Sequence, residues 1–325
     1  MLFCLREKKH QTKQEQPQNT NIPLSVDDGE GLGVRAFGAP NADPVFFEYH
    51  AVVKLLLLGS TGYLGEQFLK VYPDALTHRI DIADRAAVSH ILDSEKPDAV
   101  INCAGKTGRP NVDWCETHKE ETLRANVTGP LILLEECLAR GIYLVHMSSG
   151  CIYAGDNEGR GFTEDDPPNF IGSFYSRTKG WSDQIMKDFS VLNLRLRMPF
   201  DGSHSERNLI MKLVKYKKVL DQENSITYLP DFLEAARILI SKRKTGTFNI
   251  VNDGVISPYR IMELYKEIVD PKHAFEKLTV EKLDTVVKAG RSNCILSTDK
   301  LKGEGIRLRS VDLAVREALQ LLCPK

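Results

Sequence analysis

Short apolar runs alternate with longer stretches of helical periodicity between residues 51 and 200. The runs are "AVVKLLLLG" (51–59), "DAVINCAG" (98–105) and "IYLVHMSSG" (142–150). Continuous apolar runs of this length are typical of strands that are buried on both faces of a sheet. Between the runs, "GEQFLKVY", "RAAVSHILDSE" and "EETLRANVTGPLILLEECLARG" have the spacing of amphipathic helices, and Gly141 is a plausible C-cap of the last.

This alternation predicts βαβ units and therefore an α/β fold with a Rossmann-like doubly wound parallel sheet over 51–200. Beyond residue 200 the pattern loosens into amphipathic helices such as "FLEAARILISK" and "VDLAVREALQLL". We expect 201–325 to form a smaller α/β substrate region, with a strand near 246–252 that returns to the main sheet. Residues 1–50 are polar and lack periodicity, which predicts a flexible tail.

Composition narrows the class of protein. The 325 residues are 42% hydrophobic and 27% charged, with a net charge of −1. A balanced charge predicts no binding to nucleic acid or to an anionic membrane. No apolar run is long enough to span a bilayer. Seven cysteines without pair spacing favour a reduced, cytoplasmic compartment over a disulfide framework.

A glycine-rich turn follows the first apolar run. In "LLLLGSTGYLGEQFL", Gly59, Gly62 and Gly65 lie between a predicted strand and a predicted helix. The first glycine permits a tight turn, the second lets backbone N–H groups approach a diphosphate, and the third lets the helix pack closely on the sheet. The alternative is a turn without a ligand, but the strand–turn–helix context favours a dinucleotide site.

The GxxGxxG spacing resembles the extended short-chain dehydrogenase/reductase family. A 2′-phosphate usually requires a cation near the end of the second strand, and "LTHRIDIAD" offers Arg79 there. We therefore expect NADPH, with NADH as the alternative if Arg79 is only a solvated surface residue. Asp81 and Ile82 would border the adenine. The other expected cofactor contacts are Thr61, Tyr63, Leu64, Cys103, Ala104, Gly105, Thr107 and Met198.

Tyr175 and Lys179 have YxxxK spacing in "GSFYSRTKGWSDQIM". Residues at i and i+4 share a helix face, so the ammonium is expected to lower the pKa of Tyr175 from its usual value of about 10. Tyr175 would then donate a proton to an oxygen that receives hydride, and Lys179 would also hold the nicotinamide ribose. The alternative is an exposed helix face. In the family that the glycine turn resembles, the serine at the position of Ser149 binds the substrate carbonyl.

Cys151 follows Ser149 by two residues. Reduction of a keto sugar needs no thiol, whereas inversion of the acidified carbons beside the keto group needs an acid/base. Thiols titrate near ~8.5 and can be tuned toward neutrality, which suits this task. From its position alone, Cys151 is more readily explained as a buried small apolar residue than as an acid/base.

Several stretches resemble the plant-type UDP-4-keto-6-deoxyglucose 3,5-epimerase/4-reductases, which complete UDP-rhamnose synthesis. They are "TGRPNVDWCETHKEET", "RANVTG", "GCIY", "PNFIGSFYSRTK", "LRLRMP", "RNLIMKL" and "RSN" before "DKL", and they span residues 51 to about 305. "SSGCIY" is also similar to a stretch of GDP-fucose synthase whose cysteine acts in epimerisation. The more distant dTDP-4-dehydrorhamnose reductases carry an aspartate at that position.

The resemblance implies further roles. Cys151 and Lys212 would be the two acid/base groups of epimerisation, and Asn126 would stabilise the active-site helix. The expected substrate contacts are Gly108, Arg109, Cys151, Asn208, Arg291 and Asn293. The substrate would be a nucleotide 4-keto-6-deoxy sugar, supplied by a separate 4,6-dehydratase. Relatives often form homodimers through a helix pair.

Two other functions stay open from the sequence. The protein could be a 4-reductase only, with Cys151 as a core residue. It could instead be a regulatory subunit, because the β subunit of methionine adenosyltransferase has this fold and acts as a binding partner. The "GCIY" and "NVDWCE" stretches argue against the regulatory function.

Overall fold

The computed structural model describes residues 53–279 and 288–323. The tail expected over residues 1–50 lies outside this part of the chain. No helix within the described part is long and apolar enough to cross a membrane.

Six parallel strands form the main sheet, in the order β2-β1-β3-β4-β5-β7. The three apolar runs supply β1 (Leu55–Leu58), β3 (Ala99–Asn102) and β4 (Tyr143–Ser149), and β2 (Leu76–His78) and β5 (Leu192–Leu196) extend the sheet on either side. At one edge, β7 (Gly246–Asn249) pairs with β5, so the chain returns to the main sheet after residue 200. The predicted α/β class with a Rossmann-like parallel sheet is confirmed.

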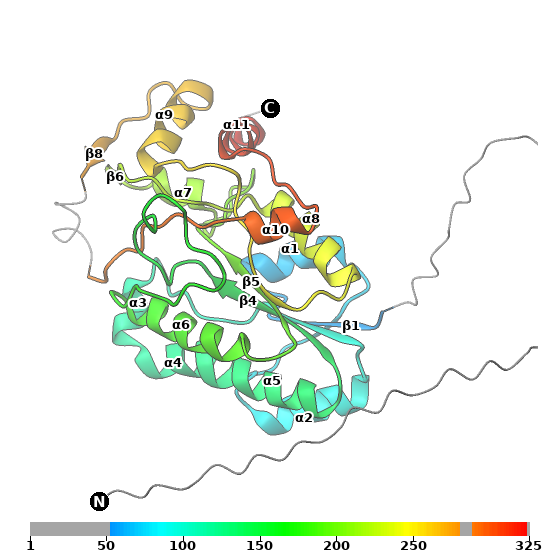
Figure 1. The fold of residues 1–325 in the computed structure, drawn as a ribbon. Coiled ribbons are helices and arrows are strands. Elements are labelled where there is room, and N and C mark those ends of the chain that lie inside the picture. Colours follow the sequence, from blue (N-terminus) through cyan, green and yellow to red (C-terminus); the bar gives the residue numbers. More distant parts are fainter. Residues whose placement is uncertain (1–52, 280–287, 324–325) are drawn as a thin grey trace, which may run out of the picture. The chain divides into compact units, whose positions relative to one another are not determined.

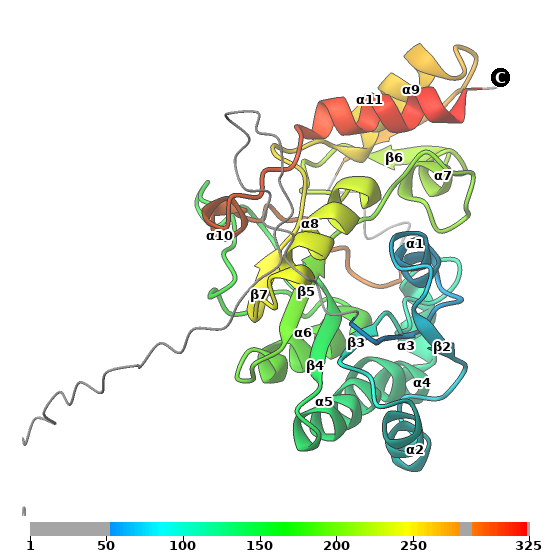
Figure 2. The ribbon, with the colours of Figure 1, turned by 90° about the vertical axis from the view of Figure 1, so that its right-hand side faces the viewer.

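Helices cover both faces of this sheet (Figures 1 and 2). One face packs against α1 (Tyr63–Val71), α8 (Leu229–Ser241) and α10 (Asp299–Gly303). The other face packs against α2 (Arg85–Glu95), α5 (Gly129–Ala139) and α6 (Phe174–Met186). Because side chains alternate along a strand, Leu55 and Leu57 belong to the first core and Leu56 and Leu58 to the second.

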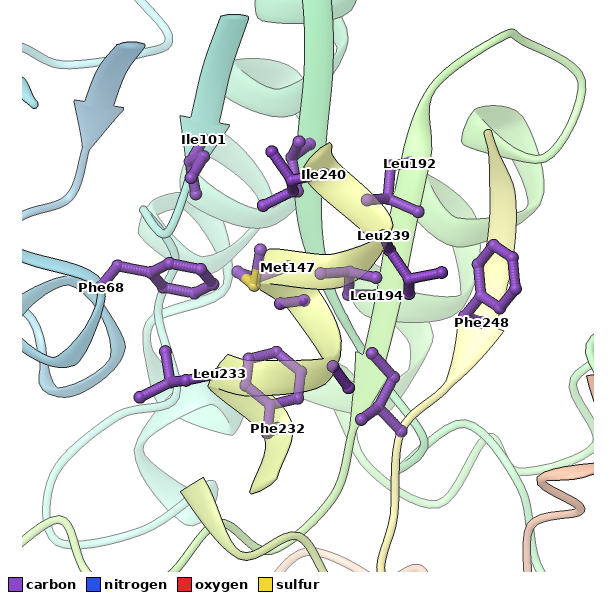
Figure 3. Packing of buried hydrophobic residues seen from close by; sticks show 14 of the residues in the cluster. Phe68, Ile101, Met147, Leu192, Leu194, Phe232, Leu233, Leu239, Ile240 and Phe248 are labelled. Carbon is purple, nitrogen blue, oxygen red and sulfur yellow. The ribbon is translucent and has the colours of Figure 1, made fainter. Parts of the chain in front are cut away.

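The first core includes Phe68 of α1, the helix that follows the glycine turn. Figure 3 shows Phe68 of α1 pointing toward Met147 of β4, with Phe232 and Leu233 of α8 beside them. The rings of Phe68 and Phe232 meet edge to face, with centroids 6.1 Å apart. This packing fixes α1 and its N-terminal turn against the sheet.

The chain predicted as one helix before β4 is interrupted by a π-helical turn. It comprises α4 (Lys119–Leu123), the π turn η1 (Arg124–Thr128) and α5, and is preceded by the short α3 (Asp113–Thr117). Asn126 lies in the π turn, and its amide holds both the N–H and the C=O of Lys106, at 2.8 and 2.9 Å. Turns of this kind are frequent at functional sites.

A second, smaller core belongs to the C-terminal region. It joins α7 (Leu209–Leu213), β6 (Lys218–Leu220), α9 (Pro258–Ile268) and α11 (Val311–Leu322). The strand β8 (Glu276–Leu278) pairs in parallel with β6 in a separate two-stranded sheet. In Figure 2, α7, β6, α9 and α11 lie beyond the carboxyl ends of the main strands.

Candidate active site

A cleft of about 950 Å³ lies at the carboxyl ends of the central strands. In an open parallel sheet, ligands bind where the strand order reverses, which here is between β1 and β3. Most of the site residues expected from the sequence line this cleft. They are Thr61, Gly62, Tyr63, Leu64, Cys103, Ala104, Gly105, Thr107, Arg109, Ser149, Cys151, Tyr175, Lys179, Met198 and Lys212.

A smaller cavity of about 210 Å³ shares several of its lining residues with the cleft. Cys151, Tyr175 and Met198 line both spaces, whereas Arg291 and Asn293 line only the smaller one. The thiol and the phenol therefore lie where two adjoining spaces meet. Such a site can hold a cofactor on one side and a substrate on the other.

The glycine turn has the packing that a dinucleotide requires. Gly59 has φ +79°, and a Cβ placed there would lie 2.5 Å from the backbone N of Ala104. A Cβ at Gly65 would lie 2.2 Å from the carbonyl oxygen of Gly59, so α1 approaches the turn at closest contact. Gly62 is exposed and caps α1 without a side-chain acceptor. The first-turn amides of α1 thus form a cradle that suits a diphosphate.

Arg79, Asp81 and Ile82 follow β2 and do not line the cleft itself. Arg79 is exposed and Ile82 is buried. The Asp81 carboxylate accepts from the backbone N–H of Ala83 and from Arg124, and these bonds hold its pKa below the usual value. Arg79 is thus an exposed cation just after the end of β2, and Arg124, bound to Asp81, is a second exposed cation nearby.

The catalytic triplet expected from the sequence comes from β4 and α6. Ser149 ends β4, and its Oγ accepts from the backbone N–H of Cys151 at 3.1 Å. Lys179 reaches through the interior, and its Nζ donates to the carbonyl of Met147 at 2.8 Å. Burial lowers the pKa of Lys179 to about 8, although Asp183 opposes the shift.

The expected lowering of the pKa of Tyr175 by Lys179 is wrong. Burial and the neighbouring Cys151 raise the pKa of Tyr175, with Ser149 and Arg197 acting against the shift. The Lys179 ammonium is directed at the carbonyl of Met147 instead. Tyr175 is consequently a protonated phenol, which is the form that a proton donor needs.

Lys212 lies on α7 and faces the cleft from the C-terminal region. Burial and the nearby Arg207 lower the pKa of Lys212. Cys151 is partly exposed and faces the same space. The cleft thus contains two acid/base groups in addition to the Ser149–Tyr175–Lys179 triplet.

The structure does not bring Asn208 or Gly108 into either cavity. Asn208 is fully buried, accepts from the backbone N–H of Ile210 to cap α7, and donates to Asp201. It positions the helix that carries Lys212. Gly108, with φ +73°, offers its carbonyl to Arg207 at 3.1 Å.

The "NVDWCE" stretch forms α3, which joins parts of the site that are distant in sequence. Asp113 accepts from Arg291 at 2.8 Å and from the backbone N–H of Ala289 at 2.9 Å. Glu116 accepts from the backbone N–H of Phe174 at 2.6 Å, at the start of the helix that carries Tyr175. Cys115 between them is fully buried and packs.

Two arginines of the site were not anticipated from the sequence. Arg207 donates to Thr107 and Gly108 and links the loop after β3 to the segment before α7. Arg197 is buried behind Cys151 and contacts its sulfur. Both lie in stretches that resemble the plant-type enzymes, "RNLIMKL" and "LRLRMP", and this resemblance is the sequence signal that points to them.

The fold and the site define a nucleotide-sugar reductase of the short-chain type. Residues 53–323 match the family model described as the RmlD substrate binding domain, and the chain belongs to that family.

Curated relatives include a bifunctional dTDP-4-dehydrorhamnose 3,5-epimerase/dTDP-4-dehydrorhamnose reductase of Arabidopsis thaliana. It is 39% identical over 267 residues, which cover 79% of this chain and 89% of that protein. A trifunctional UDP-glucose 4,6-dehydratase/UDP-4-keto-6-deoxy-D-glucose 3,5-epimerase/UDP-4-keto-L-rhamnose-reductase of the same plant is 37% identical over 270 residues. The match covers 80% of this chain but only 40% of that longer protein.

Among solved structures, the L780 UDP-rhamnose synthase of Acanthamoeba polyphaga mimivirus superposes with a TM-score of 0.79 at 32% identity. The match covers 83% of this chain and 99% of the viral one.

Proposed function

We propose that the protein is a bifunctional 3,5-epimerase and NADPH-dependent 4-reductase that converts a nucleotide 4-keto-6-deoxyglucose to the nucleotide-L-rhamnose. The observation that carries this proposal is the shared cleft, in which Ser149, Tyr175 and Lys179 occur together with Cys151 and Lys212. The activities named for the plant and viral relatives support it.

NADPH fits the cleft on its glycine-turn side, with its diphosphate on α1 and its 2′-phosphate toward Arg79. When bound, it supplies hydride to the sugar C4. Tyr175, which burial keeps protonated, gives its proton to the C4 oxygen. Ser149 hydrogen-bonds that oxygen, and the Lys179 side chain, in its charged ammonium form, holds the ribose.

Epimerisation uses the C–H bonds that the 4-keto group acidifies at C3 and C5. One base removes a proton, and the electron pair of the C–H bond moves to the C4 oxygen as an enolate. An acid on the opposite face returns a proton to the same carbon, which inverts it. We assign these roles to Cys151 and Lys212. The lowered pKa of Lys212 brings its amine form closer to neutral pH, so that it can accept as well as donate.

The smaller cavity suits the nucleotide end of the substrate. Arg291 and Asn293 line it, and Asp113 holds the guanidinium of Arg291 in place. A guanidinium fork matches the oxygens of a diphosphate. We favour the UDP sugar because the viral relative is a UDP-rhamnose synthase. A 4,6-dehydration must produce the 4-keto substrate, and we assign that step to a separate dehydratase.

The test is an incubation with UDP-4-keto-6-deoxyglucose and NADPH in D₂O, followed by NMR, for the wild type and Cys151→Ala. Cys115→Ala is the matched control because Cys115 is a buried thiol of α3 with no assigned chemistry. We expect the wild type and the control to yield UDP-rhamnose deuterated at C3 and C5. Cys151→Ala should yield no rhamnose.

Each other outcome selects a different function. Reduction without deuterium in the wild type and in Cys151→Ala would make the protein a 4-reductase only, with Cys151 as a packing residue. Turnover of the dTDP sugar but not of the UDP sugar would show that the substrate carries dTDP instead of UDP. No turnover of either sugar would reject the enzymatic proposal and favour a regulatory subunit.

A further inference from the structure

A buried guanidinium contacts the thiol of the site. Arg197 directly follows β5, and only 1% of the residue is exposed. Its Nη1 lies 3.3 Å from Sγ of Cys151. Arginine keeps its charge at any ordinary pH, so a permanent cation faces the sulfur.

The other partners of Arg197 carry no negative charge. Within the described part of the chain, its guanidinium donates to the hydroxyl of Ser292 at 2.9 Å, to the carbonyl of Ser292 and to the side-chain oxygen of Asn224. By contrast, the buried Arg195 two residues earlier forms a bidentate pair with Asp183, at 2.6 and 3.0 Å. A buried charge is costly unless an opposite charge accompanies it. A thiolate at Cys151 would supply that charge.

The guanidinium is held rigidly at this position. The hydroxyl of Ser292 donates onward to the carbonyl of Tyr153 at 2.6 Å, and the backbone N–H of Arg197 donates to Thr227 at 3.0 Å. The side-chain oxygen of Asn224 also accepts from the backbone N–H of Cys294. Arg197 therefore cannot move away from the sulfur without breaking contacts on several sides.

We propose that Arg197 is a positioning residue that keeps Cys151 as a thiolate and aims it at the sugar. This inference rests on the proposed epimerase function and identifies the base of that reaction. The thiolate takes the proton, so that an S–H bond forms as the sugar C–H bond breaks and its electron pair moves to the C4 oxygen. The Lys212 ammonium then gives a proton to the opposite face, breaking N–H and forming the new C–H bond.

Other titratable and charged groups face Cys151 from the neighbouring elements. Burial raises the pKa of both Tyr175 and Cys294, so these groups remain neutral near pH 7. Arg291 lines the smaller cavity but is paired with Asp113. Lys179 and Lys212 line the cleft, and burial lowers the pKa of each. Arg197 is thus the cation in hydrogen-bond contact with the sulfur.

The first experiment measures the alkylation of Cys151 by iodoacetamide between pH 5 and 10, resolved by mass spectrometry of its peptide. Arg197→Met removes the charge and keeps a similar volume, whereas Arg197→Lys keeps the charge. We expect alkylation at pH 7 to be roughly tenfold or more slower in Arg197→Met, with its profile shifted to higher pH. Arg197→Lys should lie closer to the wild type. Equal profiles for the wild type and a folded Arg197→Met would overturn the proposal.

A second measurement needs no substitution of Arg197, so it remains possible if Arg197→Met does not fold. The ultraviolet thiolate absorbance of the wild type minus that of Cys151→Ser is followed against pH. We expect a thiolate signal at pH 7, and its absence would also overturn the proposal. Arg197→Gln, which retains a hydrogen-bonding end, provides a second neutral variant for alkylation.

A third measurement separates this inference from the proposed function. A folded Arg197→Met should incorporate deuterium into the unepimerised sugar at least roughly tenfold more slowly, and it should lose less of its reduction of an already epimerised nucleotide 4-keto-L-rhamnose with NADPH. A thiolate in a wild type that turns over no keto sugar would reject the proposed function only. Turnover with unchanged thiol reactivity in Arg197→Met would reject only the role of Arg197.

Discussion

Gly62 and Gly65 of the turn should respond differently to one added methyl group, and this difference tests their assigned roles. Gly65→Ala places a Cβ 2.2 Å from the carbonyl oxygen of Gly59 and 2.7 Å from Cα of Ser60. Gly62→Ala meets only the carbonyl oxygen of Gly59, at 3.3 Å, and Gly62 has φ −89°, which any residue adopts. The first substitution should damage the fold, and the second should damage only cofactor binding.

The magnitude for Gly65→Ala follows from two opposing contributions. Overpacking costs about 1–3 kcal/mol or more, and the colliding atoms are backbone atoms that cannot rotate away. Alanine has a higher helix propensity than glycine, and inside α1 this stabilises the folded state by about 1 kcal/mol. A contact of 2.2 Å with backbone selects the upper end of this cost, about 3 kcal/mol, so the net loss in the free energy of unfolding is about 2 kcal/mol. The entropy of unfolding grows with chain length, so at this length the loss lowers Tm by roughly 3–4 °C.

The assays are thermal unfolding without cofactor and NADPH titration by fluorescence, with both variants purified alongside the wild type. Gly62→Ala should unfold within about 0.5 kcal/mol of the wild type, because its methyl group meets a single close atom, the carbonyl oxygen of Gly59 at 3.3 Å, which a shift of a few tenths of an ångström relieves. Its NADPH affinity should fall about tenfold or more, since the methyl group occupies the path of the diphosphate. A Gly65→Ala protein with wild-type Tm, or a Gly62→Ala protein with wild-type affinity, would refute this reasoning.

Three further predictions concern ionised groups. The Lys179 ammonium, with a pKa of about 8, is present below that pH and lost above it, so NADPH affinity should decline above pH 8. Lys179→Arg should flatten this profile, and a flat wild-type profile would contradict the role of the charge. Asp113→Asn releases Arg291, so KM for the nucleotide sugar should rise about tenfold at unchanged kcat in steady-state kinetics. An unchanged KM would remove Arg291 from the substrate site. Asp183→Asn leaves the buried Arg195 without its counter-charge and should lower the free energy of unfolding in urea by about 3–5 kcal/mol, whereas a loss below 1 kcal/mol would contradict this.

The parts of the fold that could be predicted are those with a local signal. A parallel strand buried on both faces must be apolar at every position, so β1, β3 and β4 are visible as continuous runs. The glycine turn also has a local signal, because Gly59 needs a positive φ and Gly65 packs against the carbonyl oxygen of Gly59, six residues earlier. By contrast, the π turn at Asn126 depends on a partner twenty residues away, Lys106, and the sequence predicted an uninterrupted helix there.

The site was predictable where spacing alone sets geometry and not where distant segments meet. The spacing correctly places Tyr175 and Lys179 on one helix face. It does not show that the Lys179 ammonium donates to the carbonyl of Met147, a residue of another element. Arg197 and Ser292 are 95 residues apart. Moreover, "LNLRLRMPF" alternates apolar and charged residues, as a half-exposed strand does, and nothing in it indicates that Arg195 and Arg197 are both buried.

The contact between Asp113 and Arg291 spans 178 residues and fixes a C-terminal segment to α3 of the nucleotide-binding half. A chimera that grafts residues 288–297 from another nucleotide-sugar enzyme would import a new recognition segment without the carboxylate that orients it. Exchange of both segments together preserves the anchor. During divergence, a substitution in either segment therefore selects for a compensating one in the other, so the two should coevolve as a pair although they are far apart in the gene.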